Sequence, residues 1–153
     1  MKRIMFVCHG NICRSTMAEF VFKYLARQQG LEAAFFVDSA ATSTEELGNP
    51  VHPGTRRKLA QMGIPCGDHR ARQLCKDEYG KFDLLVGMDE ANLRNMRRIL
   101  GGDSEGKIHG LLDYAGRPGE SIADPWYTGN FDETYEDVLA GCQGLLEHLL
   151  DEV

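Results

Sequence analysis

Cys8 and Arg14 are the two residues whose types and spacing carry the clearest chemistry in this chain. Cys8 ends a short apolar run, and Arg14 opens an amphipathic helical stretch beyond a brief Gly/Asn turn. A loop at a helix N-terminus presents backbone N–H groups to an oxyanion, and an arginine adds two parallel donors. The same positive field favours a thiolate over a thiol. The spacing therefore predicts an anion held against a nucleophilic sulfur.

The bare spacing Cys-x5-Arg is not specific, because the chain repeats it from Cys66 to Arg72. That second copy follows no strand-like run and lacks a trailing serine, so we interpret it as a coincidence. The first copy has Gly10 and Asn11 at positions where a positive φ is needed, and Ser15 follows its arginine. Only the first copy therefore has the surroundings of an anion site.

Strand-like and helical patterns alternate along the chain, and the strands and helices that they predict must position this loop. Strands are expected over residues 4–7, 34–37, 82–88 and 108–112, and helices over 14–29, 55–62, 89–100 and from about 131 onward. The polar connection 66–80 has room for one further short helix, and a loop runs through Pro118 and Pro125.

This alternation predicts a single doubly wound α/β domain over residues 1–153, with a four-stranded parallel sheet and helices on both faces. Ligands of such sheets bind beyond the carboxyl ends of the strands. Cys8 follows the first strand, so we expect a phosphate-binding loop there.

Composition excludes several classes of protein. The formal net charge of −6 gives no reason to expect a nucleic acid or an anionic membrane as partner. No apolar run approaches the roughly 20 residues of a membrane helix, and the first eight residues lack the apolar region of a signal peptide. We therefore expect a cytoplasmic protein. The odd number of cysteines argues against a disulfide framework, and their spacing fits no zinc site, so we expect no metal and no cofactor.

The segment Val-Cys-His-Gly-Asn-Ile-Cys-Arg-Ser closely resembles the signature of the low-molecular-weight protein tyrosine phosphatases. The resemblance continues in order at Asp38-Ser39-Ala40, His69-Arg70-Ala71-Arg72-Gln73, Met88-Asp89 with Asn92-Leu93, and Asp124-Pro125-Trp126-Tyr127. It implies metal-independent hydrolysis of phosphotyrosine and small aryl phosphates through a phosphocysteine intermediate. It also implies a phosphotyrosine-bearing protein as partner, a tyrosine kinase being one candidate, and phosphate as product.

The resemblance implies roles for the first loop that agree with its chemistry. Cys8 would attack phosphorus, and the loop amides with the Arg14 fork would hold the equatorial oxygens. Ser15 would stabilise the Cys8 thiolate as a leaving group, although a serine there could also simply cap a helix. The phosphate-binding loop then comprises His9, Gly10, Asn11, Ile12, Cys13, Arg14 and Ser15. Ser39 and His69 would support its shape, although His69 taken alone could be an ordinary structural histidine.

The leaving tyrosinate needs a proton, which an Asp close to the thiolate can supply before it activates water. Asp124, stiffened by the proline that follows it, matches the acid of the family, whereas an isolated Asp-Pro pair is usually a surface turn. Trp126 and Tyr127 would form aromatic walls around the substrate ring, or else anchor the core.

Two positions depart from the family pattern. Thr16 stands where proline is common, and Glu45 stands where relatives often carry an aromatic residue facing the pocket. A carboxylate there would repel a dianion and remove a stacking wall. We therefore expect either weaker binding of aromatic substrates or a preference for basic residues beside the phosphotyrosine.

The family resemblance also implies a reversible disulfide between Cys8 and Cys13 under oxidation. Such a bond shelters the nucleophile from irreversible overoxidation. The alternative is that Cys13 is a plain core cysteine.

Three other functions share features of the first loop. A thioredoxin-coupled arsenate reductase needs a cysteine pair after the third strand, where Val86-Gly87-Met88-Asp89 has none. Protein-arginine phosphatases tend to carry Thr at the position of Ile12, whose apolar side chain favours a flat phenyl ring. A non-catalytic phosphate-binding module has no use for Cys8, Arg14, Ser15 and Asp124 together.

Overall fold

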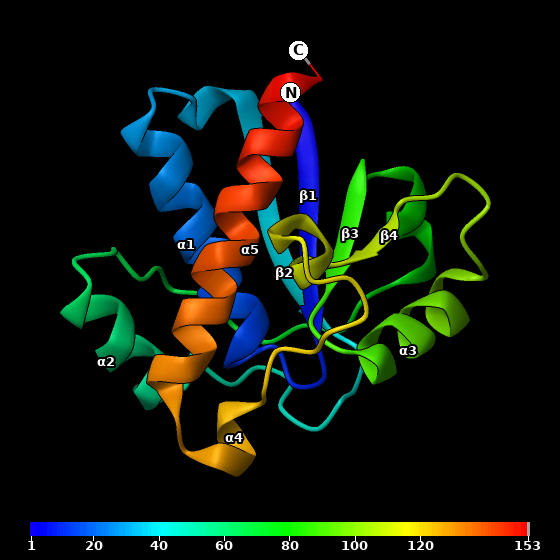
Figure 1. Cartoon of the computed structure of the whole chain (residues 1–153). Coiled ribbons are helices and arrows are strands. Elements are labelled where there is room, and N and C mark those ends of the chain that lie inside the picture. Colours follow the sequence, from blue (N-terminus) through cyan, green and yellow to red (C-terminus); the bar gives the residue numbers. More distant parts are fainter. Residues whose placement is uncertain (153) are drawn as a thin grey trace.

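Four parallel strands form the centre of the protein. The computed structural model describes residues 1–152, so Val153, the last residue of the expected domain, lies outside the described residues. The strands are β1 (Lys2–Cys8), β2 (Phe35–Ala41), β3 (Leu84–Gly87) and β4 (Ile108–Gly110), in the order β2-β1-β3-β4. This arrangement, shown in Figure 1, confirms the predicted four-stranded parallel sheet of an α/β fold.

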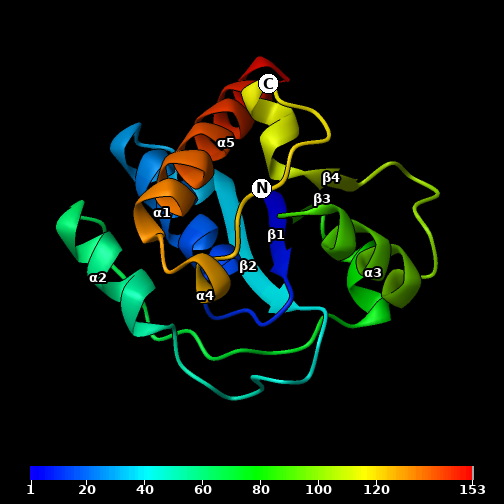
Figure 2. The same cartoon turned by 60° about the horizontal axis from the view of Figure 1, so that its bottom comes forward.

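Helices cover both faces of the sheet. They are α1 (Arg14–Gln28), α2 (Pro53–Gln61), α3 (Glu90–Leu100), α4 (Pro125–Thr128) and α5 (Phe131–Asp151), with 3-10 turns at η1 (Glu32–Ala34), η2 (Lys76–Gly80) and η3 (Leu111–Ala115). Figures 1 and 2 show α1 and α5 on one side of the strands and α3 on the other. Within residues 1–152, no helix combines the length and the apolarity that crossing a bilayer requires.

Strand β1 is buried on both faces because its apolar side chains alternate between two cores. Ile4 and Phe6 belong to the core under α1 and α5, whereas Met5 and Val7 belong to the core under α3. This double burial explains why the strand reads as an unbroken apolar run. It also fixes Cys8, the last residue of β1, at the carboxyl edge of the sheet.

Strand β2 is longer than the expected strand over 34–37, because it continues through two polar residues. Asp38 accepts a 2.8 Å hydrogen bond from Arg72 Nη2, and Ser39 Oγ donates a 2.6 Å bond to Glu19 Oε1. These partners satisfy the polar side chains inside the sheet. The sequence pattern alone indicated a loop from this point.

The prediction of a strand over 108–112 is wrong beyond Gly110, where η3 begins. Leu111 and Leu112 are buried beneath α5 rather than in the sheet. A close backbone approach allows this packing, because a Cβ on Gly144 of α5 would lie 1.9 Å from the carbonyl oxygen of Tyr114. The expected loop through Pro125 likewise contains a short helix, α4.

Candidate active site

The loop between β1 and α1 curls around the sulfur of Cys8. Asn11 is the one non-glycine residue within 1–152 that has a positive φ, at 58°, whereas the expectation of a positive φ at Gly10 is wrong. This conformation lets the Asn11 backbone N–H donate to Cys8 Sγ at 3.3 Å while its side-chain Nδ2 donates to Ser15 Oγ at 2.8 Å. The Ser15 hydroxyl lies 3.0 Å from the same sulfur. Two polar groups of the loop therefore converge on Cys8.

Ser39 and His69, which the resemblance implied as loop support, lie directly behind Asn11. His69 Nε2 is 2.7 Å from Asn11 Oδ1 and 3.3 Å from Ser39 Oγ. Burial lowers the pKa of His69, against the opposing charges of Glu19 and Asp38. Because the amide oxygen of Asn11 can only accept a hydrogen bond, His69 Nε2 is the donor in the 2.7 Å contact. The structure thus connects β2 and the 66–75 segment to the first loop.

Glu19, Asp38 and His69 are the described residues that could hold a metal ion, with ligand atoms within 4.8 Å of one another. Both carboxylates already have cationic partners. Lys23 Nζ lies 2.6 Å from Glu19 Oε2, and Arg72 Nη2 lies 2.8 Å from Asp38 Oδ2. Both carboxylates are therefore already engaged in ion pairs within the protein.

Arg14 is almost completely buried, with 3% of its surface exposed. Its Nη1 donates to Asp89 Oδ2 at 2.8 Å and to the Ile122 carbonyl at 3.0 Å, and Nη2 lies 3.5 Å from Asp124 Oδ2. Burial alone lowers the pKa of Arg14, but the charge of Cys8 and the bond to Asp89 outweigh it and raise that pKa. A charged and rigidly oriented guanidinium results.

Asp89 was not predicted as a site residue, although sequence reasoning had a signal for it. It caps α3 by accepting a 2.7 Å bond from Asn92 N, and its other carboxylate oxygen holds Arg14. It follows β3, the neighbour of β1, at the carboxyl edge where such folds bind ligands. An N-capping Asp at that position could therefore have been predicted as a site residue.

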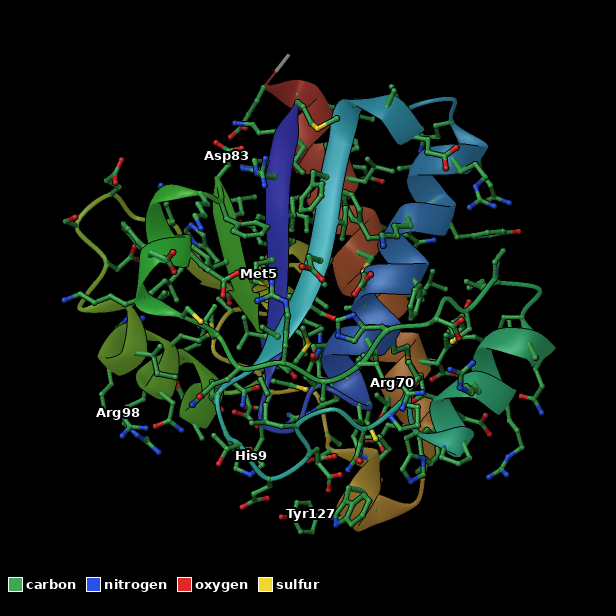
Figure 3. The ribbon with its side chains drawn as sticks, turned by 180° about the vertical axis from the view of Figure 1, so that it is seen from behind. Met5, His9, Arg70, Asp83, Arg98 and Tyr127 are labelled. Carbon is green, nitrogen blue, oxygen red and sulfur yellow. The ribbon has the colours of Figure 1, made fainter. Side chains whose placement is uncertain are left out.

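A pocket of about 90 Å³ opens over this loop. Its lining brings the predicted loop together with the predicted acid and walls: residues 8–14, Glu45, Glu46, Asp124, Trp126 and Tyr127. Cys8 contributes a sulfur that is only slightly accessible, with 3% of the residue exposed. Trp126 and Tyr127 are 58% and 82% exposed, so the alternative that they anchor the core is wrong. Figure 3 shows Tyr127 near His9 at one end of the molecule.

Asp124 is the N-cap of α4. Its Oδ1 accepts a 3.0 Å bond from Trp126 N, and its Oδ2 faces the Arg14 guanidinium. The side chain keeps 24% of its surface exposed toward the pocket that it lines. Asp124 thus places a carboxyl group in the pocket that contains the Cys8 sulfur.

Glu45 lies at the mouth of the pocket and is tied to the first loop. His9 Nε2 lies 3.0 Å from Glu45 Oε2, and both side chains are largely exposed. Ser43 adds two bonds to the His9 carbonyl oxygen, from its N–H at 3.1 Å and its hydroxyl at 2.9 Å. The acidic wall expected at this position is therefore present, with a histidine beside it.

Cys13 is a buried thiol next to the pocket floor. Burial, followed by the nearby Cys8, raises the pKa of Cys13 to about 12. The residue packs with Ile12 and Ala71 in a small apolar cluster. Both Cys8 and Cys13 are free thiols that line the same pocket. The oxidation-dependent disulfide between them stays a prediction.

Comparison with known proteins agrees with this geometry. Residues 3–153 match the family described as low molecular weight phosphotyrosine protein phosphatase. The chain is 39% identical over 153 residues to the low molecular weight protein-tyrosine-phosphatase YfkJ of Bacillus subtilis, covering 99% of this chain and 98% of that protein. It is 38% identical to the human low molecular weight phosphotyrosine protein phosphatase, covering 95% and 94%.

Solved structures are similar over the whole fold. The crystal structure of YfkJ superposes with a TM-score of 0.95, covering 99% of this chain and 96% of that chain at 38% identity. The Drosophila arginine phosphatase superposes with a TM-score of 0.85 at 28% identity, covering 97% and 98%. Because the match to this family spans residues 3–153, the chain belongs to the low molecular weight phosphotyrosine protein phosphatases.

Proposed function

We propose that this protein hydrolyses phosphotyrosine in proteins, and small aryl phosphates, with Cys8 as the nucleophile. The observation that carries the proposal is the pair of donors on one buried sulfur, from Asn11 N and Ser15 Oγ, beside the Arg14 guanidinium. Because Asn11 Nδ2 already donates to Ser15 Oγ, the serine proton is free to point at the sulfur. Such donors stabilise a thiolate and make it available for attack.

In the first step the Cys8 thiolate attacks phosphorus, and the bond between phosphorus and the tyrosine oxygen breaks. Asp124 transfers its proton to that oxygen, so that tyrosine leaves as a neutral phenol. The backbone N–H groups of the loop and the Arg14 fork hold the three remaining oxygens. Asp89 and the Ile122 carbonyl orient Arg14 before the substrate arrives, which removes reorganisation from the step.

In the second step water attacks the phosphocysteine, and the Asp124 carboxylate accepts its proton. The bond between sulfur and phosphorus breaks, Cys8 leaves as a thiolate, and phosphate is released. The Ser15 hydroxyl, 3.0 Å from the sulfur, stabilises that leaving group. Neither step is a redox reaction, and neither requires a metal ion.

The remaining residues of the site shape the loop and the substrate. His69, which itself contacts Ser39, holds Asn11 in the positive-φ conformation that the sulfur contact requires. Trp126 and Tyr127 flank the phenyl ring of the substrate, and the protein partner is one that bears phosphotyrosine, a tyrosine kinase being one candidate. The residues 1–153 act together as one phosphatase domain.

A panel of phosphopeptides tests the proposal. Peptides of one sequence that carry phosphotyrosine, phosphoserine or phosphoarginine are assayed with excess chelator. We expect kcat/KM for phosphotyrosine to exceed the others by at least about 100-fold, because the pocket walls match a phenyl ring. Faster turnover of phosphoarginine, or loss of activity with chelator, would contradict the proposal.

Replacement of Glu45 by tryptophan tests the acidic wall at the pocket mouth. The exchange removes a negative charge near the dianionic substrate and adds a stacking surface, which is worth about 0.5–1.5 kcal/mol. We expect KM for phenyl phosphate to fall by roughly threefold to tenfold with little change in kcat. Glu45→Gln is the matched control, because it removes the charge without adding a ring. An unchanged KM in both variants would show that the position does not face the substrate.

A further inference from the structure

A second groove lies beside the catalytic pocket, between α2 and the start of α5. It has a volume of about 290 Å³, and its lining includes Gly54, Arg57, Lys58, Asn130, Phe131 and Asp132. Figures 1 and 2 show α2 next to α4 and the first turns of α5 in both views. The Phe131 ring forms part of the floor and packs so closely that a Cβ on Gly54 would lie 2.2 Å from it. The groove is therefore a fixed feature of the packing.

His52 joins this α2–α5 groove to the catalytic pocket. Its ring stacks on Phe131 of the groove with centroids 5.4 Å apart, and it meets Trp126 of the pocket edge-on at 5.8 Å. Its backbone N–H also donates to the carbonyl of Ile12 in the first loop. The Trp126 and Phe131 rings are thus at most about 11 Å apart, a span of roughly three extended residues at about 3.3 Å each. A peptide that starts in the pocket can reach the groove.

The groove has a positive charge that the protein does not neutralise. Arg57 is exposed, and no acidic side chain within residues 1–152 forms an ion pair with it. Lys58 Nζ is bound to Asp132 at 2.8 Å, so that pair is balanced. The catalytic pocket is lined by Glu45 and Glu46 instead. On a chain of net charge −6, Arg57 thus gives the α2–α5 groove a cation with no acidic partner among the described residues, whereas Glu45 and Glu46 line the catalytic pocket.

We propose that the α2–α5 groove binds an acidic side chain of the substrate, a few residues away from the phosphotyrosine. The proposal rests on the proposed function, because the phosphotyrosine anchors the peptide in the neighbouring pocket. The planar Arg57 fork can donate two parallel hydrogen bonds to an Asp or Glu carboxylate. Arg57 in the groove then favours acidic residues of the substrate, whereas Glu45 and Glu46, which line the catalytic pocket, disfavour them.

Phosphotyrosine peptides that differ only in their flanks test this groove. One carries glutamates before the phosphotyrosine, one carries them after it, and one carries glutamines on both sides. We expect one of the two glutamate peptides to show a kcat/KM about fivefold above the glutamine peptide at low salt. Arg57→Glu should abolish or reverse that preference, and Arg57→Gln should remove it. Hydrolysis of p-nitrophenyl phosphate, which cannot reach the groove, should stay the same in both variants.

Arg98→Glu is the matched control, because it makes the same charge change on α3, on the far side of the molecule from α2 (Figure 3). Equal use of the three peptides by the wild type, or a preference that survives Arg57→Glu, would overturn the proposal. An equal loss in Arg98→Glu would also overturn it, by showing that net charge alone matters. If the wild type fails to hydrolyse p-nitrophenyl phosphate, the proposed function fails, and affinities of the same peptides for the Cys8→Ser protein then decide on the groove.

Discussion

Replacing Cys8 by serine is expected to abolish hydrolysis of p-nitrophenyl phosphate while leaving the binding of inorganic phosphate unchanged. The serine hydroxyl keeps the position but is a far weaker nucleophile near neutral pH, and the alkoxide is a poor leaving group from phosphorus. We expect kcat to fall by more than about 10⁴-fold. The oxyanion donors are untouched, because they come from the loop backbone and Arg14. Steady-state kinetics and calorimetric titration with phosphate measure the two effects.

Cys75→Ser provides the matched control for this loss. Cys75 is an exposed free thiol outside the pocket, so its replacement should leave kcat unchanged. Rapid acid quench of the wild type with a labelled aryl phosphate should also trap phosphate on the protein, and the Cys8→Ser protein should trap none. Substantial turnover by Cys8→Ser would assign the nucleophile to another group and remove the basis of the mechanism.

Asn in place of Asp124 is expected to lower kcat by about 10²–10⁴-fold, the usual contribution of a general acid. Asparagine keeps an oxygen that can accept the bond from Trp126 N, so α4 stays capped. It has no proton to give the leaving oxygen and cannot take one from water. The loss should therefore be greatest for substrates whose phenols are weak acids.

A series of aryl phosphates makes this test specific to proton transfer. For the wild type, kcat should change little with the acidity of the leaving phenol, whereas for Asp124→Asn it should fall steeply as the phenol becomes less acidic. Asp77→Asn is the control, because Asp77 is exposed on the surface, where it pairs with Lys81. The same dependence in wild type and Asp124→Asn would mean that another group donates the proton.

Much of the fold followed from local sequence pattern. The apolar run before Cys8 and the alternation of strands and helices predicted the parallel sheet, because double burial leaves a direct trace in the sequence. Asp38 and Ser39 are positions where the local sequence pattern does not predict the structure. Both are polar, so they indicated a loop, yet Arg72 and Glu19, distant in sequence, satisfy them inside β2. Long-range partners of this kind leave no periodic pattern.

The sequence predicted which residues line the pocket better than it predicted the contacts between their side chains. The first loop, Asp124 and the aromatic pair were expected and lie in one pocket. The link from Arg14 to Asp89 was not expected, because it depends on β3 pairing beside β1 and on the exact start of α3. Helix α4 was also missed, since four residues are too few for a periodic signal. Its Asp124 cap, Pro125 and the closing Gly129 are the cues that could have found it.

The nucleophile and the acid lie on parts of the chain with opposite local stability. Cys8 ends a strand whose last five residues are all buried, whereas Asp124 begins a four-residue helix in which only Pro125 is buried. Local opening is easiest where few apolar contacts must be broken. We therefore expect the α4 segment to open more often than β1, so that amide exchange is fast in α4 and slow in β1. The segment that carries the acid is then expected to move without displacing the Cys8 sulfur.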